Sequence, residues 1–136
     1  MEDYRVLAED FIACQTESDW QGWIERLAQH LDPDVKWDPT DMGLPDLTPC
    51  QGRAAVLQFW RDWLAAWETL AFEYELLDAD DAVVMLLDQR MRGRTSGIEV
   101  SLGEYAHVAT YRDGLVVNWR SYRSQSDALR AAGLEK

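Results

Sequence analysis

Asp38 and His107 are the two side chains of this 136-residue chain whose types and settings suit proton transfer. Asp38 follows the apolar, alternating segment 35–37 and precedes Pro39. A carboxylate at the mouth of a pocket loses water, and its pKa then rises towards the working pH of a general base. His107 lies within a long alternating segment, and a histidine that faces a cavity is the natural second member of an acid–base pair.

Both residues also have a structural interpretation. An aspartate before a proline at a strand end commonly caps a turn and faces water. Lys36 lies on the same strand face as Asp38 and could simply pair with it, a contact worth little when exposed. A lone strand histidine is often a buried side chain with satisfied hydrogen bonds, and His30 is expected at a helix end where a positive charge is favourable. The residues alone leave these alternatives open.

Tryptophan is used heavily, with seven in the chain. Nearly all of them fall on predicted core faces, so they either fill a core or line an aromatic cavity for an apolar molecule. A buried indole N–H needs a partner, which makes a wholly dry core of this many tryptophans awkward. Trp60 and Trp119 are the best candidates for facing a ligand.

The charge of the chain excludes several partners. Lys and Arg number 13 against 25 Asp and Glu, a formal net charge of −12. Such a surface argues against nucleic acid, whose phosphates need clustered basic residues, and against anionic membranes. A neutral or cationic small molecule, or a second copy of the chain, remains a favourable partner.

Targeting and metal-binding patterns are not visible in the sequence. The first residues lack the basic and apolar regions of a signal peptide, and no apolar stretch approaches a membrane-spanning length. Cys14 and Cys50 lack the spacing of a zinc site or a disulfide framework, and the two histidines are too far apart to suggest a metal. We therefore expect a cytoplasmic protein with reduced thiols, no metal and no cofactor.

Apolar spacing predicts helices first and strands afterwards. Proline and glycine between residues 38 and 51 predict a loop, and Ser126–Asp127 is expected to cap a short final helix. The predicted helices cover about residues 4–14, 18–31 and 53–67, and the predicted strands cover 35–38, 70–76, 82–92, 98–111 and 115–123. This order indicates a single α+β domain over residues 1–136, with helices on one face of a curved, mainly antiparallel sheet. The open end of such a cone is a favourable place for a ligand pocket.

Five segments resemble SnoaL-like proteins of the NTF2-like superfamily, and they span almost the whole chain: DPDVKWDP, GRAAVLQFWRDWLAAW, RGRTSG, HVATYRDGLVVNWRSY and ALRAAGL. The resemblance implies a cone-shaped barrel of three N-terminal helices packed on a strongly curved sheet, with a short C-terminal helix. It also implies a deep pocket and, often, a homodimer through the outer sheet face. The superfamily includes polyketide cyclases, ketosteroid isomerases, dehydratases, epoxide hydrolases and members without a known reaction.

The ketosteroid isomerases provide the comparison for chemistry. Asp38–Pro39 is similar to their catalytic Asp-Pro pair, while the tyrosine of their oxyanion hole falls on Phe11 and the protonated aspartate on His107. Phe11 has no hydrogen to donate, a departure that argues against steroid isomerisation. A base at Asp38 facing a donor at His107 remains suited to enolising or cyclising a ketone.

The same comparison places part of the last strand on the concave face and Asn118, Arg120 and Tyr122 outside, but it leaves the faces of Arg90 and Arg92 unassigned. The predicted catalytic residues are Asp38 and His107, and the predicted pocket lining is Phe11, Trp37, Trp60, Tyr105, Trp119, Ser121 and Arg123. The predicted function is a cofactor-independent cyclase or isomerase for a small apolar substrate. The alternatives are a non-catalytic binder of an apolar metabolite and a dimerisation module whose cavity is filled by its own side chains.

Overall fold

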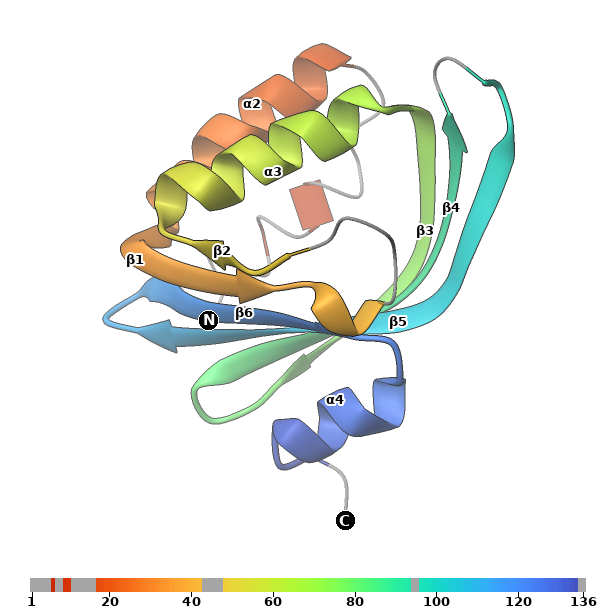
Figure 1. Cartoon of the computed structure of the whole chain (residues 1–136). Helices are drawn as coiled ribbons and strands as arrows, with labels where there is room; N and C mark the ends of the chain where they lie inside the picture. The colour runs from red at the N-terminus through yellow and green to blue at the C-terminus, as the bar shows by residue number, and fades with distance from the viewer. Residues whose placement is uncertain (1–5, 7–8, 11–16, 43–47, 94–95, 135–136) are drawn as a thin grey trace.

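The computed structural model describes residues 6, 9–10, 17–42, 48–93 and 96–134, and Figure 1 shows its course. Most of the helix predicted over residues 4–14 lies outside these residues, and so does Phe11. Within the described chain, helices and strands follow the predicted order. Their bounds are α2 Glu17–Gln29, β1 Leu31–Asp38, the 3-10 turn η1 Thr40–Met42, β2 Cys50–Gln51, α3 Arg53–Ala65, β3 Trp67–Asp78, β4 Ala82–Gly93, β5 Glu99–Arg112, β6 Leu115–Tyr122 and α4 Gln125–Ala131.

The six described strands form one unclosed sheet in the order β2-β1-β6-β5-β4-β3. β3 to β6 are joined as consecutive antiparallel neighbours, whereas β1 pairs with β6 in parallel. The sheet curls strongly around one side, where α2 and α3 lie next to each other (Figure 1). The α+β class and the curved, mainly antiparallel sheet predicted from the sequence are therefore confirmed.

The main core lies between the helices and the concave face of the sheet. Each helix contributes apolar residues spaced three or four apart, and alternate residues of β1, β4, β5 and β6 meet them. A second, smaller core lies on the convex face, where α4 packs on β4, β5 and β6. As its continuous apolar run predicts, β4 is buried on both faces, because it has core on either side.

The predicted boundaries are wrong at two junctions, from α2 to β1 and from α3 to β3. The helical spacing of tryptophans continues to Trp67, but α3 ends at Ala65 and Trp67 opens β3, paired with Gly93. Its ring still packs on Trp63, with 5.5 Å between centroids, so a contact across the helix–strand junction imitates helical spacing. The strand predicted over 35–38 begins earlier, at Leu31. Pro33 is tolerated there because the β1–β6 pairing is irregular between Leu31 and Lys36.

The cap of the last helix also differs from the prediction. Ser124, and not Ser126, precedes α4, and its side chain accepts a hydrogen bond from the backbone N–H of Asp127 at 3.2 Å. Gln125, the first residue of α4, donates from Nε2 to the carbonyls of Leu87 and Tyr105 at 3.3 Å each. These contacts anchor α4 to the convex face of the sheet.

Candidate functional site

Three tryptophans from different elements meet at the centre of the concave face, and we call them the tryptophan cluster. Trp60 of α3 stacks on Trp37 of β1, with 5.4 Å between centroids and 8° between planes. It also stacks on Trp119 of β6, at 5.6 Å and 29°. Trp37 and Trp119 are direct partners in the β1–β6 pairing, so the parallel register places both rings on one face. All three side chains are buried.

A row of aromatic rings leads outwards from the tryptophan cluster. Phe59 packs against Trp37 at 4.4 Å and stacks on Trp63 at 6.0 Å, and Trp63 packs on Trp67 at 5.5 Å. Trp63 and Trp67 are only half-buried. The ring faces therefore run from the deepest part of the core to partly exposed positions at the junction of α3 and β3.

A polar group lies at the edge of the tryptophan cluster. The Trp37 indole N–H donates to Ser121 Oγ at 3.1 Å, and Ser121 Oγ lies 2.8 Å from His107 Nδ1. The His107 ring meets Tyr105 and Trp119 edge to face, at 5.2 and 5.6 Å. Burial without an anionic partner lowers the pKa of His107 to about 3. His107 is thus a neutral hydrogen-bonding group over the whole physiological range.

Gln89 is a buried polar residue near this site that the sequence reading missed. It is 3% exposed and accepts a hydrogen bond from the Tyr105 hydroxyl, and its amide contacts Met91 sulfur at 3.3 Å. Burial raises the pKa of the Tyr105 phenol, which therefore stays protonated. The signal for Gln89 was present, since it lies between Leu87 and Met91 in strict alternation, but the preceding apolar run hid that period.

Asp38 lies in a different setting. Its carboxylate accepts hydrogen bonds from the Thr40 hydroxyl and, at 3.0 Å, from the Thr40 backbone N–H. The Thr40 hydrogen bonds, helped by the charge of Arg120, hold the pKa of Asp38 below its usual value against a smaller opposing effect of burial. Asp38 pairs with Arg120 in the register one residue beyond Trp37 and Trp119, whose rings face the core. Alternation therefore directs this position towards the convex side.

The structure brings most of the predicted lining residues together and separates others. Trp37, Trp60, Tyr105, Trp119, Ser121 and His107 share the concave face. Arg123 is exposed, and its backbone N–H donates to the Asp41 carboxylate at 3.2 Å. Arg90 and Arg92, whose faces the sequence left open, are both exposed, because their buried neighbours Gln89 and Met91 take the inner positions.

A bulge in the last hairpin changes one expected orientation. Val117 and Trp119 are alternate apolar residues in the sequence, a spacing that by itself predicts that both face inwards. The β5–β6 register shifts between Thr110 and Tyr111, and Val116 enters the main core, whereas Val117 is only half-buried. One extra residue on a strand reverses the alternation on one side of the bulge, which residue types alone do not reveal.

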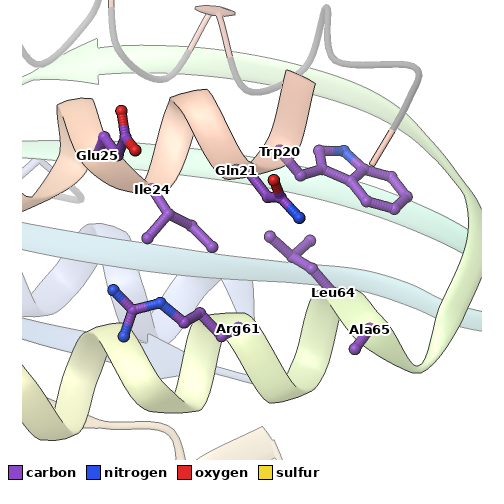
Figure 2. Close-up of a pocket in the computed structure, with 7 residues that line it drawn as sticks. All are labelled: Trp20, Gln21, Ile24, Glu25, Arg61, Leu64 and Ala65. Atoms are coloured by element: carbon purple, nitrogen blue, oxygen red, sulfur yellow. The ribbon is translucent and has the colours of Figure 1, made fainter. Parts of the chain in front are cut away.

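A separate groove of about 360 Å³ lies between α2 and α3. Figure 2 shows Trp20, Ile24 and Leu64 around the space between the two helices, with Arg61 reaching along α3 and Glu25 directed away from it. The sequence reading did not predict this groove, because it assigned the apolar residues of both helices to the core. It is distinct from the tryptophan cluster, none of whose residues line it.

Groups that could hold a metal or react as a thiol bear on the chemistry that the described part of the chain can perform. There, no three His, Cys, Asp or Glu side chains are grouped so that they could hold a metal ion. No described helix is long and apolar enough to cross a membrane. Cys50 is half-buried, and burial raises the pKa of its thiol, which disfavours the reactive thiolate.

Solved structures share this fold. An NTF2-like protein of unknown function from Burkholderia pseudomallei is 17% identical, with 97% of this chain and 98% of that chain covered and a TM-score of 0.69. A protein with a ketosteroid isomerase-like fold from Catenulispora acidiphila, solved with trimethylamine, is 15% identical, with 94% and 92% covered and a TM-score of 0.65. A proposed SnoaL-like polyketide cyclase from Jannaschia sp. is 16% identical, with 96% and 92% covered and a TM-score of 0.65.

The sequence itself matches one family model. No curated protein matches the sequence. The model of the SnoaL-like domain matches residues 8–119, which include all three residues of the tryptophan cluster. Because the match covers most of the chain and the NTF2-like fold agrees with it, this protein belongs to the SnoaL-like domain family.

Proposed function

We propose that this protein binds a small, neutral, ring-containing molecule against the aromatic side chains of its concave face, with His107, held by Ser121, supplying the polar contact. The observation that carries the proposal is a neutral histidine and a serine held at the edge of three stacked tryptophans. Flat aromatic faces favour flat apolar ligands, and one or two placed polar groups fix the orientation of such a ligand.

The electrostatics of the concave face favour a neutral ligand. The described side chains around the tryptophan cluster are apolar or uncharged, and the histidine among them is neutral. A charged ligand would lose its hydration there without a compensating charge, which is costly. The half-buried Trp63 and Trp67 offer ring faces by which an apolar molecule could first associate before it moves deeper.

Titration of intrinsic tryptophan fluorescence tests this proposal, with a panel of steroids, aromatic polyketides, terpenoids and epoxides. Saturable quenching by one class is expected, with affinity weakened at least severalfold in Trp119→Phe. Trp20→Phe is the matched control, because Trp20 is also a buried tryptophan but lines the groove between α2 and α3. A flat response from folded protein, or equal weakening by both variants, would contradict the proposal and favour an interior filled by its own side chains.

Proton transfer by Asp38 is a second candidate function. It is favoured by fully buried Pro39, which holds the Asp-Pro pair at the end of β1, although the hydrogen bonds from Thr40 lower the pKa of the carboxylate. The same hydrogen bonds from Thr40 weaken it as a base, so catalysis requires the carboxylate to leave Thr40. The carboxylate must also turn from the convex side towards the concave face, where it would take a proton α to a carbonyl while His107 donates a hydrogen bond to the oxygen.

Asp38→Asn separates the two functions. If Asp38 is a base, the variant loses turnover of a ketone found in the panel and keeps its affinity within about twofold. Unchanged turnover would refute the catalytic role, and joint loss of folding and binding would identify Asp38 as structural. Thr40→Val is the companion variant, because it frees the carboxylate from the hydroxyl and should raise turnover if that hydrogen bond restrains the base.

We also propose that the protein forms the homodimer that the family resemblance implies, through the convex face of the sheet. Arg120 lies over the Tyr122 ring at 5.0 Å on the convex face, beside the area that α4 covers. Aromatic and arginine side chains are enriched in protein interfaces, which supports this surface as the contact. Light scattering should then give twice the monomer mass, and Tyr122→Glu should give monomers. A monomeric wild type would exclude the homodimer.

A further inference from the structure

Ser121 is a buried hydroxyl whose hydrogen bonds can be followed atom by atom. Its side chain is 0% exposed, and its partners within the described chain are Trp37 Nε1 and His107 Nδ1. An indole N–H only donates, so Ser121 Oγ accepts from Trp37. The serine hydrogen is still to be placed, and a buried hydroxyl that donates to nothing costs free energy.

His107 Nδ1 is the acceptor that Ser121 can reach, at 2.8 Å. If Nδ1 carried the hydrogen, Ser121 would accept twice and its own hydrogen would have no acceptor among the described residues. If Ser121 donates, both groups are satisfied. The hydrogen bonds then run in one direction, from Trp37 to Ser121 to His107, and Nδ1 is the unprotonated nitrogen of the ring.

A neutral imidazole has one hydrogen, so an unprotonated Nδ1 places it on Nε2. We propose that Trp37 and Ser121 are positioning residues that hold His107 as the Nε2–H tautomer, so that the site recognises a ligand oxygen that accepts a hydrogen bond. His107 is 7% exposed, and no described donor or acceptor reaches Nε2. A ligand carbonyl could accept a hydrogen bond from this N–H.

The ligand part of this inference rests on the proposed function and narrows its substrate class. A ketone, quinone or ester oxygen accepts from Nε2–H, whereas an amine or a hydroxyl that must donate finds no acceptor there. The Nδ1–H tautomer would leave Nε2 as an acceptor, and the site would then select ligands that donate a hydrogen bond. Trp37 and Ser121 would therefore set the specificity of the site, although only His107 would form a hydrogen bond with the ligand.

His30 provides an internal contrast. Its Nδ1 lies 2.9 Å from the Arg26 carbonyl oxygen, which only accepts, so Nδ1 of His30 must carry a hydrogen. When both rings are neutral, the two histidines of this chain should be opposite tautomers. Long-range ¹H–¹⁵N correlation spectra of ¹⁵N-labelled protein distinguish protonated from unprotonated ring nitrogens, and His30→Gln assigns the signals.

The expected spectrum at alkaline pH shows His107 with an unprotonated Nδ1 and a protonated Nε2. Ser121→Ala, which removes the donor with little change of volume, should shift the Nδ1 signal and populate the other tautomer. His30→Gln should leave His107 unchanged. A protonated Nδ1 in the wild type, or a His107 spectrum that Ser121→Ala does not alter, would overturn the positioning role.

Two probes of matched shape test the ligand class: 2-acetonaphthone, a ketone, and 2-isopropenylnaphthalene, in which a methylene replaces the oxygen. The ketone should bind about tenfold more tightly, the effect of one buried hydrogen bond, and Ser121→Ala should reduce that preference. Equal affinities would overturn the ligand class. Binding of neither probe would overturn the ligand class if a compound of the fluorescence panel still binds, and it would refute the proposed function only if none of them binds. The tautomer would in either case be decided by the spectrum.

Discussion

On the concave face of the sheet, His107 lies among tryptophan, tyrosine and serine, whereas on the convex side Asp38 lies in a turn beside Arg120. Both groups have a lowered pKa, for opposite reasons. Burial removes the charged form of the histidine, while hydrogen bonds from Thr40 favour the charged form of the aspartate. One face is built to hold neutral groups, and the other holds a permanent carboxylate.

The difference bears on function. A general base needs a pKa near the working pH, and neither group approaches it, since both are shifted downwards. A hydrogen-bond donor needs only to keep its proton in place, which the concave face achieves. The comparison therefore ranks recognition by His107 above proton abstraction by Asp38.

The largest effect is expected for the neighbours Trp119 and Arg120. Trp119→Ala removes a buried ring from the tryptophan cluster and should lower the free energy of unfolding by about 3–5 kcal/mol. Arg120→Ala removes an exposed side chain from the opposite face and should change it by about 0.5 kcal/mol or less. Urea unfolding at neutral pH measures both, and similar losses would contradict the assignment of the two faces.

The next effect is a pH dependence due to His107. Its folded pKa of about 3 lies below the unfolded value of 6.5, so between these values the unfolded chain binds the extra proton. The contribution is complete above pH 6.5 and is lost as the pH falls towards 3, at about 1.4 kcal/mol per pH unit. His107→Gln should reduce the slope of unfolding free energy against pH in this window. An unchanged slope would mean that His107 is charged or exposed.

A smaller effect is expected at Asp38. Asp38→Ala removes the acceptor for Thr40 and should cost about 1 kcal/mol at neutral pH, as for other side-chain caps. Because the folded pKa lies below the usual 3.8, this stability is present above pH 3.8 and is lost as the pH falls through the folded value. Asp38→Asn keeps an acceptor and should lose little. Greater loss in Asp38→Asn than in Asp38→Ala would refute the turn role.

The smallest effect compares the two serines near α4. Ser124→Ala should cost about 1 kcal/mol of unfolding free energy, because the side chain caps the helix, whereas Ser126→Ala should be nearly neutral. Thermal unfolding of both variants measures the difference. A greater loss in Ser126→Ala than in Ser124→Ala would identify Ser126 as the cap, as the sequence suggested.

Much of the fold was predictable because it depends on the local spacing of apolar residues and on the turn residues between elements. Val56, Trp60 and Leu64 indicated α3 by their spacing, and the turn at Asp113–Gly114 indicated the last hairpin. The junction at Trp67 was not predictable, since a ring that packs back on Trp63 satisfies a helical period and a strand equally. The ends of β1 and β3 were decided by pairing with strands distant in sequence.

The candidate site was predictable by residue type and only partly by position. Trp37, Trp60, Tyr105, Trp119, Ser121 and His107 were identified by their placement on alternating or helical faces together with the family resemblance, whereas Gln89 was hidden by the apolar run before it. Arg123 was placed on the concave face by the comparison with the ketosteroid isomerases, but β6 ends at Tyr122 and the chain there turns towards α4. Alternation holds only while the strand is paired.

The sequence by itself determined the class of fold, the acidic surface, the aromatic interior and the family, because composition and periodicity act along the chain. Only the tertiary structure decided that Ser121 lies between Trp37 and His107, 84 and 14 residues away in sequence. It alone assigned Asp38 to Thr40 and Arg120 rather than to the histidine. Those assignments depend on the register of β1, β5 and β6, and a shift of one residue in a strand would exchange the two faces.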